Sequence, residues 1–343
     1  MSIGNIGTSG LSTSDSVELA APVQVSPLLK LLQLSAGDKY GDAVDRAWTS
    51  GVDPTGRTIV DVGLHGCEAV AEAVRAGFLV HGFEPAPAHM ANCHRLLPPD
   101  KRYDAPVEDL ASGKLTSLQW WAKQRLILHT GVGAPPASSR AGAGFAFLYQ
   151  AALSNTSSVG RPFTVGAGGS SSLHMPVNEA IAQGKLASEV KRVTVPVLRL
   201  DEAVDEDLWL LKMDTQGNEG HVLAGSAGLF MRRTVAHVLS EFDPRLLRRA
   251  GTPPRQVLAL LHRAGFLCFD VRNPRGAPWA LGRTHPLGID AYVEAMDRHE
   301  ISALKQRPAP KWAKNFGAFD DIACANAAKV WRPASVPKAV SPT

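Results

Sequence analysis

The sequence predicts an α/β protein in which helices cover both faces of a mainly parallel sheet. Two observations lead to this prediction. Short apolar or β-branched runs alternate with segments of helical periodicity, first over Thr58–Glu84 and again over Trp209–Val271. Gly77 and Gly265 directly follow two of the predicted helices, where glycine commonly ends a helix. This regular alternation is typical of parallel strands joined by right-handed crossovers.

The first predicted unit is a β-α-β segment. Thr58–Val62 is a short β-branched strand. Apolar residues then recur at helical spacing from Val70 onward, with charged residues on the other face of the helix. Phe78–Phe83 forms the next strand-like run. We expect the two strands to be parallel neighbours.

The second predicted unit continues the alternation. Trp209–Met213 is an apolar strand, and Glu219–Phe230 is a predicted helix. Val235–Phe242, Gln256–Ala264 and Phe266–Val271 follow as strand, helix and strand. These elements extend the same sheet.

One main domain with flanking segments is expected. A flexible leader covers 1–25, an N-terminal helical extension 26–56, the main domain 57–330 and a short tail 331–343. Within the main domain, residues 134–192 contain Pro-, Gly- and Ser-rich stretches with little periodicity. We interpret them as an insertion over the sheet edge, near the ligand crevice.

Charge and hydropathy disfavour several classes of function. The 36 Lys and Arg residues exceed the 32 Asp and Glu residues only slightly, and they are spread along the chain, so a nucleic-acid partner is not indicated. No apolar run approaches the roughly 18 residues that a membrane span needs. Met1–Leu29 lacks Lys and Arg, unlike a secretory signal or a mitochondrial presequence. A cytoplasmic location is therefore expected, and the oligomeric state stays open.

The cysteine spacing gives no sign of a metal site or of a dense disulfide framework. The four cysteines lie far apart without a C-x-x-C pair, at Cys67, Cys93, Cys268 and Cys324. A reducing compartment is the default expectation. His89, Cys93 and His94 lie close in sequence, but they share a helix face only in part and no fourth ligand follows. We therefore predict no metal.

The end of the first strand has features of a nucleoside site. Gly63 and Gly66 follow Asp61 and allow a backbone to approach a ligand closely, although a tight turn without a ligand explains them too. Glu84 lies about 20 residues further on, where an acidic side chain accepts hydrogen bonds from ribose hydroxyls. NAD is disfavoured because the third glycine is missing and Glu68 would repel a pyrophosphate. S-adenosylmethionine has the adenosine group without the phosphates.

A second group of polar residues follows the strand Trp209–Met213. It consists of Asp214, Gln216, Asn218 and Glu219. Such density directly after a buried strand indicates a binding or catalytic site, although a helix N-cap explains part of it. Glu241 and Asp243 end the next strand at the same edge, either in a functional role or as solvated loop carboxylates.

Several other residues allow two interpretations. His65 is either a base near the reacting group or a ring that packs the turn. Cys67 is either a reactive thiol or, as we expect, a small buried side chain at a helix start. The basic residues after these strands either meet an anionic substrate or, more commonly, form a solvated surface; they are Arg232, Arg233, Arg245, Arg248 and Arg249.

Three blocks of the sequence together resemble the FkbM-type methyltransferases. They are Asp61-Val62-Gly63 with Phe83-Glu84-Pro85, Ser171-Ser172-Leu173 leading into Val195–Glu202, and Leu211–Glu219 with Leu223–Ser226. The third block is similar to the family's K-I-D-V-Q-G-x-E and L-x-G-A motifs and is the most specific. The family's opening motif usually reads D-x-G-A-N-x-G. Here Leu64 and His65 stand at the Ala and Asn positions, and Cys67 stands at the second glycine position.

The resemblance implies a Rossmann-like class I methyltransferase that uses S-adenosylmethionine, with O-methylation of a sugar or small metabolite as the expected reaction. Asp61, Gly63, Gly66 and Glu84 are the predicted cofactor-binding residues. A base is useful because a hydroxyl is a poor nucleophile until it loses its proton. Asp214 or Glu219 is the first candidate base and Glu241 the second.

Two other functions remain open. The turn after the first strand, Gly63–Cys67, is called the opening turn. Its altered residues are compatible with a catalytically silent binding protein that has lost cofactor affinity. A nucleotide-dependent oxidoreductase is the least favoured, because the third glycine is absent.

Overall fold

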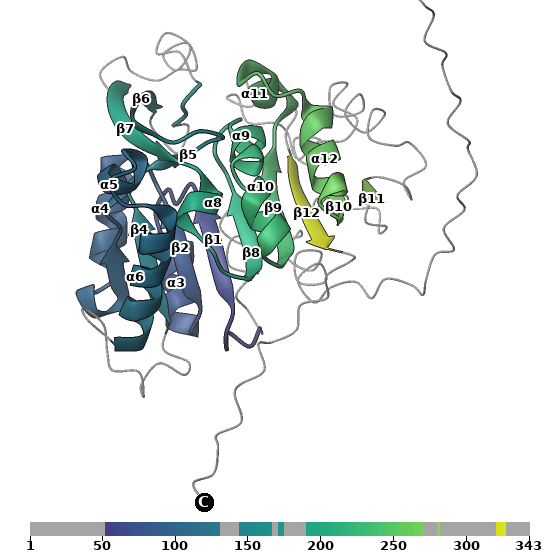
Figure 1. Ribbon diagram of the computed structural model, residues 1–343. Helices are drawn as coiled ribbons and strands as arrows, with labels where there is room; N and C mark the ends of the chain where they lie inside the picture. The colour runs from purple at the N-terminus through teal and green to yellow at the C-terminus, as the bar shows by residue number, and fades with distance from the viewer. Residues whose placement is uncertain are drawn as a thin grey trace, which may run out of the picture.

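In the part of the chain that the structure describes, a nine-stranded mixed sheet forms the centre of this computed structural model (Figure 1). Residues 52–130, 144–166, 171–174, 190–270, 280–281 and 320–326 are described. The leader, the tail and nearly all of the expected helical extension lie outside these residues. The strands in chain order are β1 (Thr58–Val62), β2 (Leu79–Phe83), β3 (Arg102–Asp104), β4 (Phe145–Tyr149), β8 (Leu208–Met213), β9 (Val235–Phe242), β10 (Phe266–Asp270), β11 (Ala280–Leu281) and β12 (Asp320–Asn326).

The spatial order of the strands is β11-β10-β12-β9-β8-β1-β2-β4-β3. The six strands from β9 to β3 are parallel to one another. The order reverses at β1, which lies between β2 and β8, so the sheet is doubly wound, in agreement with the predicted Rossmann-like fold. β12 is antiparallel to both β9 and β10.

Helices cover both faces, as the sequence predicts. Their bounds are α3 (Glu68–Ala76), α4 (Pro87–Leu96), α5 (Val107–Ala111), α6 (Ser117–Thr130), α8 (Leu200–Ala203), α9 (Glu219–Ala224), α10 (Ala227–Arg232), α11 (Pro244–Arg249) and α12 (Pro254–Arg263), with a 3-10 turn at Pro99–Lys101. Side chains alternate between the faces of β1. Ile59 belongs to the apolar cluster that contains residues of α3 and α4, whereas Val60 and Val62 belong to the cluster that contains residues of α6, α9, α10 and α12. Because both faces are covered, every residue of β1 and β8 is buried.

The predicted element boundaries agree closely with the structure, with one exception. Gly77 ends α3 in the left-handed conformation, with φ of 105°. The single helix expected over Glu219–Phe230 is instead divided into α9 and α10 at Gly225. The Gly225 carbonyl accepts a hydrogen bond from the Asp201 backbone, and the Ser154 carbonyl lies against Gly225, so the chain leaves the helical path there.

Residues 152–198 contribute a second sheet, which lies beside the upper end of the main sheet in Figure 1. Its strands are β5 (Ala152–Leu153), β6 (Ser158–Val165) and β7 (Lys191–Leu198), in the order β5-β7-β6. The interpretation of 134–192 as an unpatterned insertion is wrong for β4. That strand is buried throughout and lies between β2 and β3 in the main sheet.

All four cysteines form disulfides. Cys67 pairs with Cys93 and joins the start of α3 to α4, and Cys268 pairs with Cys324 across β10 and β12. These two disulfides disagree with the default expectation of a reducing compartment, where cysteines stay as free thiols. Sequence spacing did not reveal the pairs because each one is made by the fold, between segments 26 and 56 residues apart. Among the described residues, no helix is long and apolar enough to cross a membrane.

Candidate functional site at the carboxyl edge of the sheet

The predicted site residues meet where β1, β2, β8 and β9 end, at the top of Figure 1. Hydrogen bonds join the strand ends: the Gly63 N–H donates to Phe83, and the Asp214 N–H donates to Val62. Gly63 has φ of 88°, and a Cβ atom there would lie 2.0 Å from the Asp214 carbonyl oxygen. Glycine is thus required at the first turn, since only glycine allows this approach of two chains.

A buried ion pair lies directly beneath this turn. Lys212 of β8 places its Nζ 3.1 Å from an Asp61 carboxylate oxygen of β1. The same Nζ donates a 2.9 Å hydrogen bond to the Gly63 carbonyl. Asp61 and Lys212 are both buried. Asp61, predicted to bind cofactor, therefore supports the turn from below.

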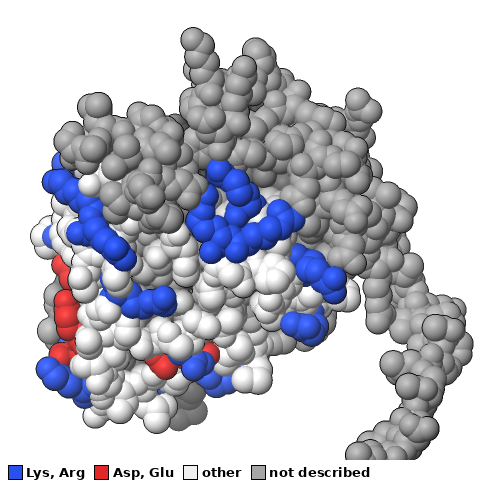
Figure 2. Space-filling model, turned by 90° about the horizontal axis from the view of Figure 1, so that it is seen from above, with Lys and Arg blue, Asp and Glu red and all other residues white. Residues whose placement is uncertain are grey.

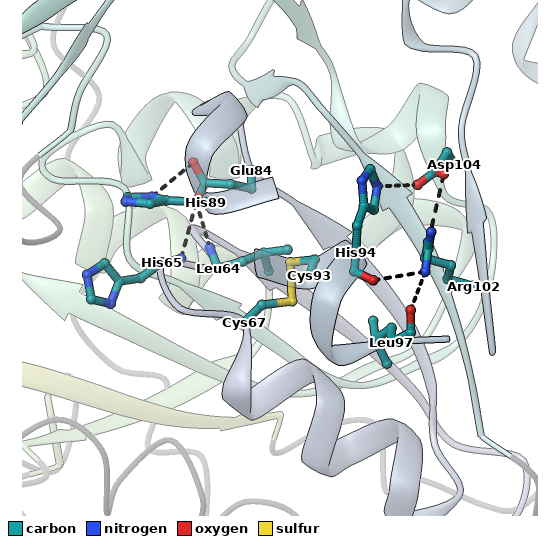
Figure 3. Close-up of a disulfide and its surroundings, with 10 residues drawn as sticks. All are labelled: Leu64, His65, Cys67, Glu84, His89, Cys93, His94, Leu97, Arg102 and Asp104. Atoms are coloured by element: carbon teal, nitrogen blue, oxygen red, sulfur yellow. Dashed lines mark hydrogen bonds and ion pairs between the residues drawn. A yellow bond between two sulfur atoms is a disulfide. The ribbon is translucent and has the colours of Figure 1, made fainter. Parts of the chain in front are cut away.

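Glu84 holds the turn from the side of β2 (Figure 3). Its Oε2 accepts the N–H groups of Leu64 and His65 at 3.1 and 3.2 Å, and its Oε1 accepts the Ala86 N–H at 2.8 Å. The carboxylate is buried. A carboxylate has about four acceptor positions, so these bonds leave one position, on Oε1.

His89 approaches that remaining position. Its Nδ1 lies 3.6 Å from Glu84 Oε1, and the interaction raises the pKa of His89 above 6.5. The exposed His65 ring meets the His89 ring edge to face, with centroids 5.2 Å apart. Among the described residues, no group of His, Cys, Asp and Glu is arranged to hold a metal ion. Cys93 is in a disulfide and His94 contacts Asp104 instead.

The two predicted glycines of the turn differ. Gly63 has a positive φ, whereas Gly66 does not. The Glu68 carboxylate occupies the space beside Gly66 where a Cβ would lie. Two other residues of this turn have a left-handed backbone conformation: His65, with φ of 48°, and Cys67, with φ of 68°. Left-handed backbone is thus imposed on two residues for which it is unfavourable.

Glu219 holds the second loop, after β8. Its Oε1 accepts hydrogen bonds from the Thr215 N–H at 2.8 Å, the Thr215 hydroxyl at 2.9 Å and the Gly217 N–H at 3.3 Å. Burial, and then the charge of Asp214, raise the pKa of Glu219 to about 7. These contacts make Glu219 a support for the loop.

Gln216 connects the other two predicted carboxylates. Its amide Nε2 donates to Asp214 Oδ1 and to Glu241 Oε2, each at 2.9 Å. Asp214 is exposed, and Glu241 is partly buried. Burial, and then the charges of Asp214 and Glu219, raise the pKa of Glu241 well above 4.5. The structure therefore brings Asp214 and Glu241 together in one group.

The sequence did not identify His174 as a site residue. Ser172 donates its hydroxyl proton to the Gln216 carbonyl and accepts the His174 N–H. His174 Nε2 lies 3.0 Å from Asn218 Oδ1, and its ring stacks on His221. Burial lowers the pKa of His174, which favours the neutral ring. Only its position directly after the Ser-Ser-Leu block was a signal for it.

The five arginines considered from sequence do not form one surface. Arg232 and Arg233 precede β9 and pair with Asp205, at the amino edge of the sheet. The other three belong to α11, which follows β9 at the carboxyl edge and packs against Gly217. Figure 2 looks onto this end and shows Lys and Arg side chains in separate groups on the visible described surface.

The reversal of strand order at β1 defines a doubly wound α/β protein, and the polar side chains described above lie at the adjacent strand ends, where such folds bind ligands. The family model for the methyltransferase FkbM domain matches residues 61–268. The chain belongs to this family of methyltransferases, with a Rossmann-like fold.

Solved structures give distant similarities. The FkbM methyltransferase of Methylobacillus flagellatus KT is 10% identical, with a TM-score of 0.30, and the match covers 70% of this chain and 52% of that one. This chain thus matches about half the length of that protein. StiE O-MT residues 961–1257 are 10% identical, with a TM-score of 0.32, and the match covers 88% and 74%. A geranyl diphosphate methyltransferase in complex with SAM is 10% identical, with a TM-score of 0.29 and coverage of 85% and 94%. A comparison with curated proteins gives no match.

Replacing Lys212 with Met tests the ion pair. The variant removes the positive charge beside the Asp61 carboxylate and the donor to Gly63, so we expect the free energy of unfolding to fall by about 3–5 kcal/mol. Urea denaturation at pH 7 measures this. The double variant Asp61→Asn/Lys212→Met removes both charges and should recover part of the loss. If Lys212→Met is as stable as the parent, the conclusion that the ion pair supports the Gly63 turn is wrong.

Replacing Glu219 with Gln tests its raised pKa. A carboxyl whose pKa rises on folding stabilises the protein below its unfolded value of 4.5, and this contribution is lost as the pH rises to about 7. The parent should therefore lose up to about 3 kcal/mol relative to Glu219→Gln over this range. Denaturation of both proteins at pH 4.5, 6 and 8 gives the difference between their free energies of unfolding. The contributions of the other titrating groups are common to both proteins and cancel in this difference. A difference that does not change with pH would show that Glu219 titrates normally.

Proposed function

We propose that this protein transfers a methyl group from S-adenosylmethionine to a hydroxyl oxygen of a sugar or small metabolite. One observation carries the proposal: a glycine turn held by a buried carboxylate lies at the same sheet edge as two carboxylates joined by Gln216. Membership in a methyltransferase family supports the class of reaction.

The residues after β1 and β2 fit the nucleoside part of the cofactor. The remaining acceptor position of Glu84, on Oε1, suits one ribose hydroxyl. His89 has to share that oxygen or turn away from it. This differs from the sequence-based expectation that Glu84 accepts both ribose hydroxyls, since Oε2 is already used by the turn. Gly63 provides the backbone surface beside the ligand.

The carboxylates after β8 and β9 fit the reacting end. Bound S-adenosylmethionine supplies a methyl group on a positively charged sulfur. The negative charge of Asp214 favours a cation nearby. Asp214 is exposed and its Oδ1 is oriented by Gln216, so an acceptor can reach it, and it is the first candidate for the base that takes the acceptor proton. The larger contribution of the site is to hold the acceptor oxygen in line with the methyl group, which lowers the activation barrier by up to about 7–11 kcal/mol.

Glu241 is the second candidate base, and Glu219 becomes the least favoured of the three. Glu241 shares the Gln216 amide with Asp214, and its raised pKa keeps it protonated at a pH where an ordinary Glu is charged. Glu219 directs its Oε1 to the loop backbone. A positioning role for Glu219 follows from these bonds.

The alternative is a binding protein without catalytic activity. The unusual residues of the opening turn favour it, because Leu64, His65 and Cys67 replace the family's typical residues. Cofactor binding separates the two functions.

Calorimetric titration with S-adenosylhomocysteine tests the cofactor site. We expect the parent protein to bind it and to melt at a higher temperature, because a ligand of the folded state stabilises that state. Glu84→Ala should weaken binding by about 10- to 100-fold, since it removes charge-assisted hydrogen bonds to the ligand and to the turn. Glu72→Ala, in the middle of α3, is the matched control and should bind like the parent. Parent-like binding by Glu84→Ala would remove the ribose assignment, and no binding by the parent would favour the silent protein.

Asp214→Asn and Glu241→Gln identify the base. Transfer of labelled methyl groups to a panel of monosaccharides gives the turnover. If Asp214 is the base, Asp214→Asn should lose about 10²–10⁴-fold in turnover while S-adenosylhomocysteine affinity stays within about threefold. If Glu241 is the base, turnover should rise with pH through its raised pKa, and Glu241→Gln should abolish that rise. Parent-like turnover of Asp214→Asn would assign the proton transfer elsewhere.

A further inference from the structure

Cys67 occupies a backbone position that suits glycine better than cysteine. It directly precedes α3, and its φ of 68° lies in the left-handed region. A residue with a Cβ atom is unfavourable there, whereas glycine is not. The FkbM-type opening motif has a glycine at this position. The present chain has cysteine there and bonds it to Cys93.

The disulfide is part of the same group of contacts as the proposed ribose carboxylate (Figure 3). Cys93 and His89 are four residues apart on α4, so they share a helix face. That face contacts the opening turn at two places: His89 contacts Glu84 and His65, and Cys93 is bonded to Cys67. The turn is thus tied to α4 by one covalent bond and several weaker contacts.

We propose that the Cys67–Cys93 disulfide is a reversible redox site that controls cofactor affinity. This inference rests on the proposed function. The disulfide holds Cys67 in the left-handed conformation and thereby keeps the N–H groups of Leu64 and His65 directed at Glu84. When the bond opens, Cys67 relaxes to an ordinary conformation, the turn leaves Glu84, and the ribose site is lost.

The chemical step is a thiol–disulfide exchange with a dithiol reductant. One thiolate of the reductant attacks a sulfur of the pair, and the Cys67–Cys93 bond breaks as a mixed disulfide forms. The second thiol of the reductant then releases the protein thiol and closes a disulfide in the reductant. The protein gains two electrons and two protons, and the reductant loses them.

Burial of the two cysteines couples this step to the ligand. Cys67 is 1% exposed and Cys93 is not exposed at all, so the turn and α4 must separate before a reductant can reach the sulfur atoms. A ligand that holds the turn against Glu84 opposes that separation. Because linkage between two sites is reciprocal, reduction weakens cofactor binding and the bound cofactor protects the disulfide from reduction.

The test uses the variant Cys268→Ala/Cys324→Ala, in which Cys67–Cys93 is the remaining disulfide. S-adenosylhomocysteine is titrated by calorimetry into the oxidised form and into the form reduced with dithiothreitol, and alkylation with mass spectrometry reports the thiols. We expect binding to be about 5- to 150-fold weaker after reduction, the range that release of one strained residue gives. We also expect saturating S-adenosylhomocysteine to slow the reduction by a similar factor.

Two further variants in the same background separate the backbone effect from the loss of a bond. Cys67→Gly/Cys93→Ala lacks the disulfide but tolerates the left-handed conformation, so it should bind like the oxidised form and be insensitive to dithiothreitol. Cys67→Ala/Cys93→Ala should bind as weakly as the reduced form. If the Gly and Ala variants bind equally, the conformational explanation is wrong.

Hydrogen exchange at Leu64 and His65, measured without ligand, gives a readout that does not need cofactor binding. Reduction should speed exchange at both amides. Full reduction with unchanged exchange and unchanged affinity would overturn the proposal. A third outcome is that no form of the protein binds S-adenosylhomocysteine but reduction still speeds amide exchange at Leu64 and His65. In that case the proposed function and the redox control of cofactor affinity are both wrong. The conclusion that the disulfide restrains the turn would still hold.

Discussion

The ion pair between Asp61 and Lys212 is the interaction on which the site depends. It joins the two strands on which the strand order reverses, and the Lys212 ammonium also binds the Gly63 carbonyl. Two buried charges are costly unless each has a partner of opposite charge. Beside this ion pair, the Asp214 N–H donates to the Val62 carbonyl, and the pairing of β1 with β8 brings the Gly63 turn against the Asp214 loop. The contact of Gly63 with the Asp214 backbone, which leaves no room for a side chain, is the consequence.

The fold was predictable because its signals are local. The β-branched strand at Thr58–Val62, the glycine after α3 and the alternation of strands and helices depend on neighbouring residues, and the structure agrees with them. The strand β4 was missed although Phe145–Tyr149 is wholly apolar, because the Gly- and Pro-rich residues around it contain no periodicity. The break between α9 and α10 was missed because its cause, contact with Ser154 and Asp201, is distant in sequence.

The sequence predicts which residues lie at the candidate site better than it predicts what each of them contacts. Parallel strands end at one edge, so Gly63, Glu84, Asp214 and Glu241 could be placed together from the sequence. What each side chain binds depends on tertiary contacts that no spacing reveals. Glu219 supports its loop, Gln216 connects two carboxylates, and His174 comes from a segment about 40 residues before the loop that it contacts. The disulfide between Cys67 and Cys93 is another tertiary contact that the spacing of the cysteines does not reveal.

The opening turn shows how side-chain contacts can replace a sequence motif. Glycine allows left-handed backbone without cost, and a chain that lacks glycine there needs interactions that hold the unfavourable conformation. In this protein those interactions are the bonds from Glu84 to the turn, the packing of His65 on His89 and the bond from Cys67 to Cys93. A motif held by glycine is independent of its surroundings, whereas a motif held by contacts responds when one of them is broken. The departure from the family pattern is therefore compatible with a retained site whose affinity depends on the state of those contacts.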